Sequence, residues 1–413
     1  MILSDKKIFI IGTVWPEPNS SAAGLRMIQL ITFLRSEGAE LIFGSSASMS
    51  DHSYDLESLD VRCVRVEINN VSFDDLISSM NPDMVIYDRF MTEEQYGWRV
   101  TDQCPNAIQI LDTEDLHFMR EGRRMRKEQF ATQENITDYL NLDIAMRELS
   151  SIFRCDLSMI ISTAEMDILK HLRVPEELLQ YIPIVYDAIN TAFAPAFGKR
   201  NGFFTIGNFR HPPNRDSVQY LYEKVWPLIR QQLPDAQMHV YGSYPAEKDM
   251  QLDQPEKGFH IHGRADDLDQ VLQKHRLMLA PLRFGAGIKG KFLSAFNVGI
   301  PAVTTSIGAE GINSQDPGWP GAISDSPSEL AQKAVQLYID QEKWVEASGK
   351  CRPLINNHFL KDDYFQSFAE KLKYLHHNVR SHRSRNLIGQ LLRFNANRST
   401  MFMSKWIEEK NKN

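Results

Sequence analysis

The feature that most constrains the fold is an alternation of short apolar runs with segments of helical spacing. Residues Lys7 to Thr13 (KIFIIGT) are rich in β-branched and aromatic side chains, which predicts a strand. After a loop-like stretch with two prolines, apolar residues recur at helical spacing from Leu25 to Leu34. The run Ala39 to Gly44 predicts the next strand. A strand, a helix and a strand in this order begin a doubly wound α/β sheet.

This pattern occurs twice along the chain. The first half has further predicted strands at Met84–Tyr87, Ala107–Leu111 and Leu157–Ser162. The second half has predicted strands at Gly202–Gly207, Gln237–Tyr241, Phe259–His262, Leu277–Ala280 and Ala302–Thr305, and a predicted helix over Asn214–Leu233 with Asn214 or Asp216 near its start. With 413 residues the chain is too long for one ordinary domain. We therefore expect an α/β protein of two tandem Rossmann-like doubly wound domains that face each other across a cleft.

The expected domains are residues 1–186 and 187–360, with a linker in the segment Tyr181 to Pro195. Residues 361–413 follow as a helix that returns to the first domain and a basic amphipathic tail. In this architecture ligands bind in the crevice at the carboxyl ends of the strands. The cleft between the two domains is therefore the expected site.

Composition excludes several other classes of protein. No apolar stretch approaches the roughly 18 residues of a spanning helix, and the run Ile8 to Ile11 is too short for a signal peptide. Cys63, Cys104, Cys155 and Cys351 are widely spaced, which argues against a disulfide framework or a zinc site. We expect a cytoplasmic protein with unpaired thiols and no bound metal.

One glycine-rich stretch combines backbone freedom with positive charge. Residues 285 to 296 read GAGIKGKFLSAF, between the strand ending at Ala280 and an apolar helix that starts near Lys289 or Lys291. Glycines let the backbone approach a ligand, and a helix N-terminus adds partial positive charge. Lysines at a helix start oppose the dipole unless an anion lies there, so the stretch predicts a phosphate or diphosphate site. The alternative is a glycine-rich turn with two solvated lysines.

Several segments, in order, resemble the GT-B glycosyltransferases of the large retaining group called family 4 or glycosyl transferases group 1. They are GNFRHPPNRDSVQYL (207–221), VYGS (240–243), HGRADDL (262–268) and APLRFGAGIKGKFLSAFNVGIPAVTTSIGAEGI (280–312), with looser likeness in LDTEDLHFMREGRR (111–124) and DLSMIISTAEMDIL (156–169). The resemblance covers residues 7 to about 375. It implies that the second domain binds a nucleotide-activated sugar and the first binds the acceptor.

The resemblance also implies roles for individual residues. Lys289 and Lys291 would clamp the diphosphate, and the amides near Gly287 and Ile288 would donate to it. Arg210 would reach the diphosphate or be a surface arginine. Many relatives carry two glutamates where this chain has Ala286 and Ser294, so Ser294 would replace the carboxylate that binds the ribose. Glu310 would supply a carboxylate in the cleft, or cap the following turn.

The first domain offers candidates at two expected strand ends. Ser21, Gly24 and Arg26 follow the first strand and suit close contact with the acceptor, although a plain helix cap by Ser20 or Ser21 explains the serines equally well. Asp112 and Asp115 follow the strand Ala107–Leu111 and suit acceptor binding or proton handling. We assign these two as catalytic candidates and His117 as structural; helix capping by the acidic residues is the alternative.

Two basic regions remain. The cluster from Arg120 to Lys127 suits an anionic acceptor, or a solvated helix face paired with Glu121 and Glu128. The segment from Lys371 to Asn413 has ten Lys or Arg and two acidic residues, Glu408 and Glu409, which gives it a net charge of +8. Because the whole chain has a net charge of −7, the first 370 residues carry −15. The tail fits an anionic membrane surface at the inner face of the membrane, or docks on the protein's own acidic body.

These observations together predict a glycosyltransferase of the hexosyltransferase type. It would move a sugar from a nucleotide-diphosphate sugar to a glycan, a lipid-linked acceptor or a protein. Retention, and transfer without an obligatory metal or cofactor, are what the resemblance implies. The alternatives are a non-catalytic nucleotide-sugar-binding or scaffolding protein, favoured by Ala286 and Ser294, and a GT-B nucleotide-sugar epimerase. No aromatic stacking platform for nucleic acid is present in the sequence.

Overall fold

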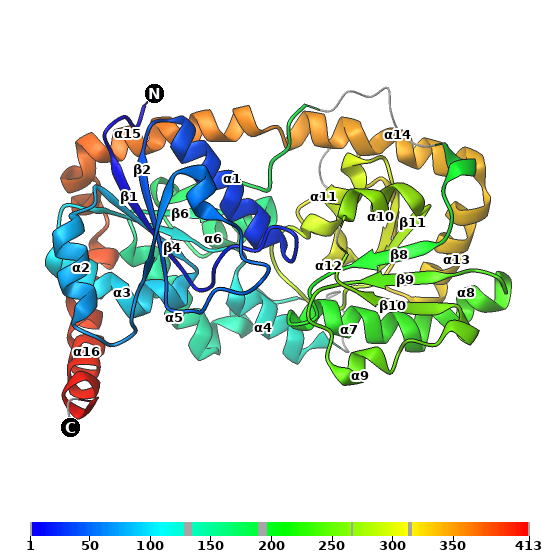
Figure 1. Ribbon diagram of the computed structural model, residues 1–413, viewed down its shortest axis with the longest axis horizontal. Coiled ribbons are helices and arrows are strands. Elements are labelled where there is room, and N and C mark those ends of the chain that lie inside the picture. Colours follow the sequence, from blue (N-terminus) through cyan, green and yellow to red (C-terminus); the bar gives the residue numbers. More distant parts are fainter. Residues whose placement is uncertain (1, 128–133, 189–195, 266, 313–315, 412–413) are drawn as a thin grey trace.

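The computed structural model describes residues 2–127, 134–188, 196–265, 267–312 and 316–411. They form two α/β domains side by side, each with a parallel sheet and helices on both faces (Figure 1). The expected fold class is confirmed. The second part of the expected linker, residues 189–195, lies outside the described residues, and Tyr181 at its start is the last residue of a strand.

The first domain has a seven-stranded sheet in the order β3-β2-β1-β4-β5-β6-β7. Its strands are β1 Lys7–Gly12, β2 Glu40–Ser45, β3 Val61–Arg65, β4 Met84–Asp88, β5 Ile108–Asp112, β6 Leu157–Ile160 and β7 Leu179–Tyr181. Its helices are α1 Ala22–Ser36, α2 Ser72–Met80, α3 Phe90–Gln103, α4 His117–Met125, α5 Asp143–Arg154 and α6 Thr163–His171, with short 3-10 turns at Leu56–Leu59, Ile136–Asn141 and Glu176–Leu178.

The second domain has a six-stranded sheet in the order β10-β9-β8-β11-β12-β13. Its strands are β8 Phe203–Ile206, β9 Met238–Tyr241, β10 Phe259–Gly263, β11 Leu277–Ala280, β12 Ala302–Thr304 and β13 Gly321–Ile323. Its helices are α7 Pro212–Tyr220, α8 Trp226–Gln232, α9 Glu247–Met250, α10 Leu268–Lys274, α11 Gly290–Asn297, α12 Ser306–Ala309, α13 Pro327–Ile339 and α14 Gln341–His358, with short 3-10 turns at Phe197–Lys199 and Pro255–Lys257.

The central strands read as continuous apolar runs because both of their faces are covered. Ile10 of β1 pairs in register with Phe43 of β2 on one side and Ile86 of β4 on the other, and all three are fully buried. Each sheet separates two hydrophobic clusters, one under each layer of helices. This is the arrangement expected of a parallel sheet with crossover helices.

The helix expected over Asn214–Leu233 differs in detail from the prediction. It begins earlier, at Pro212, where a proline fits because its missing N–H would have no partner within the helix. A π-helical stretch, Leu221–Val225, separates α7 from α8 directly before Trp226 and Pro227. Pro227 cannot donate a backbone hydrogen bond, and a local π-turn is one of the ways in which a helix adjusts to this.

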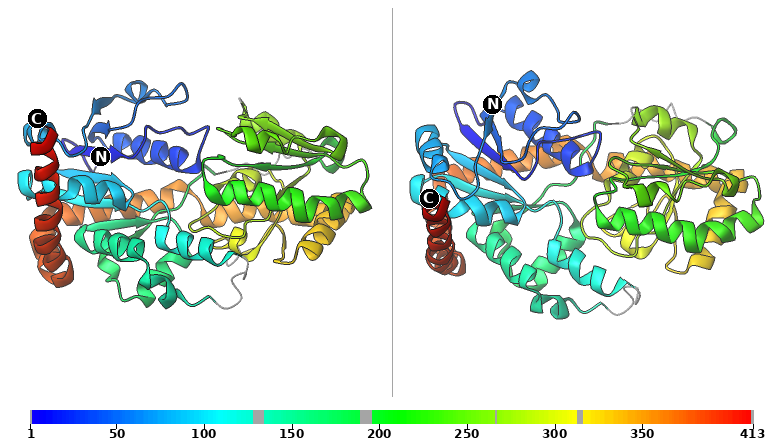
Figure 2. Two further views of the ribbon diagram at one scale, coloured as in Figure 1. Left: turned by 90° about the horizontal axis from the view of Figure 1, so that it is seen from below. Right: turned by 60° about the horizontal axis from the view of Figure 1, so that its bottom comes forward.

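Two long helices complete the chain. Helix α15, Lys361–Arg385, runs back along the first domain (Figures 1 and 2) and contributes Phe365 and Phe368 to its core. Phe365 stacks on Phe33 of α1 with ring centroids 4.4 Å apart. Helix α16, Leu387–Asn411, packs across α3 and α5. None of the described helices combines the length and the apolar character needed to cross a bilayer. The four cysteines are unpaired, as expected.

Candidate functional site

Loops that follow strands at or next to the points where strand order reverses meet between the two domains. In the first sheet the order reverses between β1 and β4, and in the second between β8 and β11. Ligands of open α/β sheets bind outside the carboxyl ends of strands at such points. The loop of residues 281–289, which follows β11, contacts the first domain. Its partners there are the segment after β5 and helix α4.

Gly287 brings the glycine loop against the first domain. Its φ is +66°, and a Cβ at this position would lie 3.0 Å from both the Asp115 Cβ and the Ile161 Cδ1. Only glycine combines this backbone conformation with so close an approach. The Gly287 amide donates to the Glu165 Oε1 of α6 (2.8 Å), which also accepts from the Leu116 amide (2.7 Å). The amide expected to face a diphosphate therefore has a carboxylate partner from the other domain.

Glu165 is a buried carboxylate with unused bonding capacity. Its Oε2 is buried and has no hydrogen-bond partner in the described part of the chain. Burial, together with the nearby Asp115 charge, raises the pKa of Glu165 to about 8. Near pH 7 this carboxyl is therefore mostly protonated, which removes the cost of a buried charge beside Asp115.

The two lysines of the loop differ in their surroundings. The Lys289 ammonium is buried; it donates to the Gly287 carbonyl (2.9 Å) and lies 3.6 Å from a Glu310 carboxylate oxygen. Lys291, in the first turn of α11, donates to the Asn214 side-chain oxygen of α7 (2.7 Å). Burial lowers the pKa of both, that of Lys291 to about 7. Glu310 therefore faces the Lys289 amine, and Lys291 is only partly charged near pH 7.

Arg123 of α4 links the first domain to the second. Its guanidinium is buried and makes a bidentate ion pair with Glu310 (2.6 and 2.7 Å), and it donates to the Gly285 carbonyl (2.8 Å). It also binds both oxygens of Glu134 (2.7 and 2.8 Å). These carboxylates raise the Arg123 pKa against the opposing effect of burial. Glu310 thus faces the cleft boundary with two cationic partners, Arg123 and Lys289.

Arg210, Ser294 and Ile288, the remaining donor-site candidates, each contact other residues. The exposed Arg210 guanidinium stacks over the Tyr244 ring at 3.7 Å, and the Tyr244 hydroxyl donates to Glu17 of the first domain (2.9 Å). The Ser294 hydroxyl lies 3.5 Å from that of Tyr186. The Ile288 side chain is buried in the cluster that includes Ile161 and Ile184, at the junction of the domains.

Asp112 belongs to a fully buried ion cluster. The Arg26 guanidinium binds both of its carboxylate oxygens (2.5 and 2.6 Å) and approaches Glu114 (3.4 Å). Arg26 also donates to the Ile182 carbonyl (3.2 Å). Burial raises the pKa of Asp112 against the effect of Arg26, and burial with the Asp112 charge raises that of Glu114 to about 8. In this conformation Asp112 and Arg26 neutralise each other, and the role of either in catalysis or acceptor contact stays a prediction.

Asp115 lies closer to the glycine loop. Its carboxylate pairs with Arg120 and lies 3.4 Å from the His117 Nε2. Burial opposes its charge, but Arg120 and the nearby histidines lower its pKa below the usual range. Asp115 is therefore an ionised carboxylate at the contact between the domains.

The acidic residues after β5 do not cap α4. The amides of His117 and Phe118 donate to Glu148 of α5 (3.0 and 2.9 Å), and that of Leu116 donates to Glu165. The capping alternative for Asp112 and Asp115 was therefore wrong.

Ser21 and Gly24 shape the start of α1. The Ser21 hydroxyl accepts from the Gly24 amide (3.0 Å), so the capping role considered for Ser21 is confirmed. A Cβ on Gly24 would lie 2.5 Å from the Glu17 backbone, so this glycine lets the loop after β1 fold against the helix.

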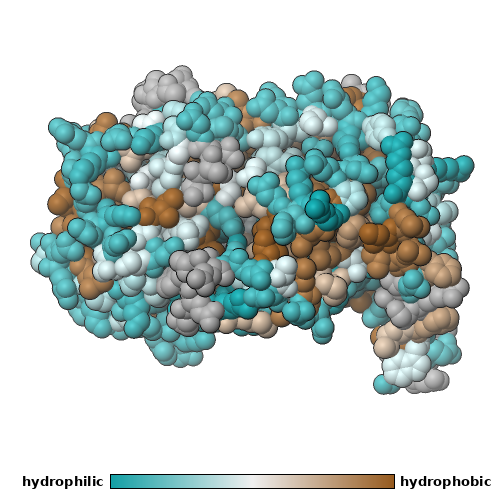
Figure 3. Space-filling model, turned by 180° about the vertical axis from the view of Figure 1, so that it is seen from behind, coloured by the Kyte–Doolittle hydropathy of each residue, from teal (hydrophilic) through white to brown (hydrophobic). Residues whose placement is uncertain are grey.

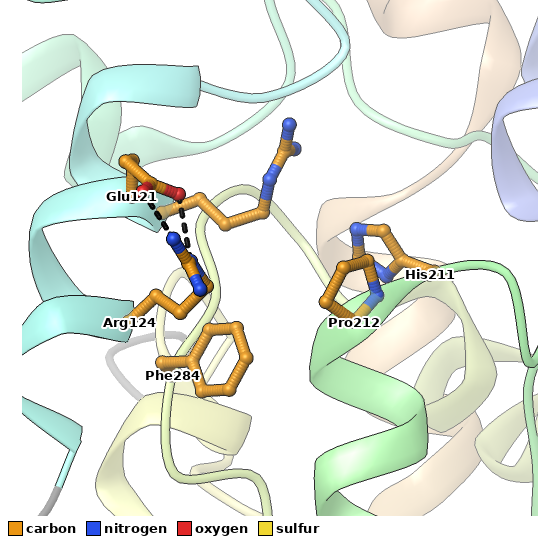
Figure 4. Close-up of a pocket in the computed structure, with 6 residues that line it drawn as sticks. Glu121, Arg124, His211, Pro212 and Phe284 are labelled. Atoms are coloured by element: carbon orange, nitrogen blue, oxygen red, sulfur yellow. Dashed lines mark hydrogen bonds and ion pairs between the residues drawn. The ribbon is translucent and has the colours of Figure 1, made fainter.

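A pocket of about 350 Å³ opens beside these contacts. It is lined by Arg120, Glu121, Arg124, His211, Pro212 and Phe284. Figure 4 shows Glu121 and Arg124 on α4 facing His211 and Pro212 at the start of α7, with Phe284 between them. Arg124 pairs with Glu121 in its own helix (2.6 Å), as the helix-face alternative expected. The basic cluster thus divides: Arg120 and Arg124 line the pocket, whereas Arg123 holds the second domain. Glu128 lies outside the described residues.

The structure brings Asp115, Gly287, Lys289 and Glu310 together. It places Lys291 beside α7 and keeps Asp112 with Arg26 in a separate buried cluster. Glu165 was missed as a site residue, and Arg123 was considered only as a member of the basic cluster, because no local pattern distinguishes either residue. Within the described residues no group of three or more His, Cys, Asp or Glu side chains is arranged to hold a metal ion.

The protein has two facing Rossmann-like domains. A glycine loop and a helix that begins with two lysines lie where the domains meet, and this arrangement is that of the GT-B class. Residues 200–340 match the sequence model of the family described as glycosyl transferases group 1, so the second domain carries this family's signature. No curated protein sequence matches the chain.

Solved structures confirm the GT-B fold over most of the chain. Sucrose-phosphate synthase from Thermosynechococcus elongatus is 13% identical, with 90% of this chain and 99% of that chain covered and a TM-score of 0.66. HepE from Anabaena, solved with UDP and glucose, is 13% identical, with 90% and 100% covered and a TM-score of 0.63. A glycosyltransferase from Rickettsia africae is 11% identical, with 90% and 98% covered and a TM-score of 0.63.

Proposed function

We propose that this protein is a glycosyltransferase that moves a sugar from a nucleotide-diphosphate sugar to an acceptor bound by the first domain. The observation that carries the proposal is the pair Lys289 and Lys291 at the N-terminus of α11, inside the segment that matches glycosyl transferases group 1. HepE, which shares the fold, was solved with UDP and glucose, so UDP sugars are the first donors to test.

The chemistry follows from where charge develops during transfer. When the bond between the sugar and the diphosphate breaks, negative charge grows on the leaving diphosphate. The two lysine amines and the α11 dipole would stabilise it, and the Gly287 and Ile288 amides would donate to it once Glu165 releases Gly287. Arg210 would add a further positive charge if it leaves the Tyr244 ring. These groups can supply the positive charge that other transferases take from a metal ion. We therefore propose transfer without an obligatory metal or cofactor.

The acceptor would enter through the pocket between α4 and α7. Arg120 and Arg124 line it, and Arg120 also pairs with Asp115. Both predicted catalytic carboxylates are paired with an arginine, Asp112 with Arg26 and Asp115 with Arg120. We propose Asp115 first for proton handling because it adjoins Gly287 of the glycine loop, and Arg120 would have to release it. A glycan, a lipid-linked sugar or a protein each remain within this proposal, as does retention of configuration. The unpaired cysteines fit the reducing cytoplasm.

Calorimetric titration with UDP, GDP, dTDP and their common sugars tests the proposal. We expect tight binding of one nucleotide, lost by more than tenfold in Lys289→Ala/Lys291→Ala. The matched control is Lys343→Ala/Lys350→Ala, which removes two exposed lysines of α14 in the same domain and should leave the affinity unchanged. No binding of any nucleotide contradicts the proposal.

A non-catalytic nucleotide-sugar-binding protein is the second candidate, because Ser294 cannot act as a carboxylate toward the ribose. It predicts nucleotide binding without release of free sugar from the donor. A chromatographic assay of donor hydrolysis separates the two candidates, since transferases commonly hydrolyse their donor slowly when no acceptor is present. Interconversion of the donor sugar without its release would instead indicate an epimerase.

A further inference from the structure

Helix α16 presents an unusual distribution of side chains. Its apolar residues Leu387, Leu391, Phe402 and Trp406 are each more than half exposed. At 3.6 residues per turn these four positions fall within an arc of about 100°. A helix that only packs on its own domain turns such a face inward. Here the apolar face points to solvent.

The opposite side of α16 holds it to the first domain through polar contacts. Arg99 of α3 is buried; it donates to the Ser404 hydroxyl (3.0 Å) and pairs with Glu408. Arg393 pairs with the buried Asp156 (2.9 Å). These contacts fix the rotation of α16 about its own axis. Because its polar side is bound to the first domain, its apolar face must point outward.

Basic residues outnumber acidic ones on and around the exposed face, where Glu409 is an exposed carboxylate. Arg380, Arg385, Lys405 and Lys410 are exposed on α15 and α16, and Lys410 lies over the Trp406 ring at 5.3 Å. The segment from Lys371 carries +8, whereas the preceding 370 residues carry −15. Figure 3 shows hydrophobic residues on the projecting helix and beside its base, next to hydrophilic surface.

We propose that the outward face of α16 binds an anionic lipid surface, with its apolar side chains in the headgroup region and the flanking lysines and arginines on lipid phosphates. Leu, Phe and Trp on one face with basic residues around them are typical of helices that lie in a membrane interface. The sequence predicted a membrane partner for the whole basic tail, and the structure narrows the contact to one face of α16. Binding through this face does not depend on transferase activity.

Two other occupants fit the observations less well. The protein's own acidic body already binds the polar side of α16 through Arg393, Ser404 and Glu408, so the outward face is not the one that docks there. A second copy of the chain in a two-fold dimer would bring this face against itself, because such an interface uses the same patch on both subunits. Its basic residues would then repel each other, whereas an anionic surface complements them.

Vesicle flotation with the full chain tests the proposal. Vesicles of phosphatidylcholine alone are compared with vesicles containing about one third phosphatidylglycerol, at low and high salt, since surface electrostatics weaken with ionic strength. We expect binding to the anionic vesicles only, at least tenfold weaker in Leu391→Ser/Phe402→Ser/Trp406→Ser and weaker in high salt. The matched control is Met250→Ser/Ile339→Ser/Val345→Ser, three exposed apolar residues of the second domain, which should bind like wild type.

Folding and function are monitored separately. Thermal melting shows whether each variant is folded, and nucleotide titration shows whether the donor site is intact, so a failure of the membrane proposal is distinct from a failure of the proposed function. Equal binding of the α16 variant, or no preference for anionic vesicles, overturns the proposal. A dimer in light scattering that the α16 substitutions dissolve, without vesicle binding by the wild type, overturns it in favour of a second copy.

Discussion

At the scale of single residues, Lys291 is a side chain whose charge depends on what binds beside it. Burial lowers its pKa to about 7, and it donates a hydrogen bond to the neutral Asn214 side-chain amide. An anion beside the amine stabilises its charged form and raises this pKa, so binding takes up a proton above pH 7. We expect the affinity for a nucleoside diphosphate to fall by up to about tenfold per pH unit between pH 7 and 9. Calorimetry in buffers of different ionisation enthalpy measures the proton uptake.

Lys291→Arg supplies the critical comparison, because arginine stays charged throughout this range. The variant should bind without the proton uptake that the wild type shows. Lys350→Arg, at an exposed position of α14, should keep the wild-type uptake. If Lys291→Arg takes up as many protons on binding as the wild type, a group other than Lys291 takes up the proton.

At the scale of elements, four histidines gather at one edge of the second sheet. His239 of β9 shares a hydrogen bond with His262 of β10 (2.9 Å), and its ring lies about 5 Å from those of His260, His262 and His275. Burial, then the neighbouring imidazoles, lowers the pKa of His239 to about 4, and burial lowers that of His275 to about 4. The unfolded chain, with histidine pKa near 6.5, therefore binds more protons as pH falls below 6.5.

This difference makes the second domain sensitive to mild acid. The histidine contribution to its stability is fully present above pH 6.5 and is lost progressively as pH falls toward 4. At pH 5 the loss is up to about 2 kcal/mol for the buried His275 and smaller for the half-buried His239, whose charge is partly screened by solvent. We expect His239→Gln to flatten the fall in melting temperature between pH 7 and 5. His171→Gln, at an exposed histidine of the first domain, should follow the wild-type curve. Parallel pH curves for His239→Gln and wild type would show that the histidine stack does not cause the acid sensitivity.

The elements also show what the sequence could predict. The buried central strands were located correctly, because strands covered on both faces are continuous apolar runs. The strands that were not predicted, β3, β7 and β13, each lie at an edge of a sheet. Edge strands are covered on fewer sides, and β7 and β13 have only three residues each. Their sequences, VRCVR, LQY and GAI, therefore carry little periodic signal.

In the site, too, the sequence predicted only those residues that a local pattern marks. The glycine loop and its lysines follow a predictable strand, so a local pattern located them. Arg123 and Glu165 act on residues 187 and 122 positions away, Glu310 and Gly287. Only the packing of one domain on the other decides that Arg123 holds Glu310 whereas its neighbour Arg124 pairs within its own helix.

At the scale of the whole molecule, polar contacts from the first domain hold the glycine loop in place. Arg123 binds Glu310 and the Gly285 carbonyl, and Glu165 binds the Gly287 amide. The loop that we propose for the diphosphate is therefore bound by protein groups in this closed arrangement. Opening of the cleft would release the Gly287 amide for a ligand, so domain movement and donor binding are expected to be coupled.

Arg123→Met tests this coupling, because methionine keeps much of the side-chain bulk and removes the charge. Loss of one partner of a buried ion pair costs about 3–5 kcal/mol, enough to shift a closed two-domain equilibrium toward open forms. We expect a larger radius of gyration in small-angle X-ray scattering of the variant, with the secondary structure unchanged by circular dichroism. Arg124→Met is the control: its exposed guanidinium pairs with Glu121 of the same helix, so its scattering should match the wild type. Identical radii for all three proteins would mean that α15 and the remaining contacts fix the domains without Arg123.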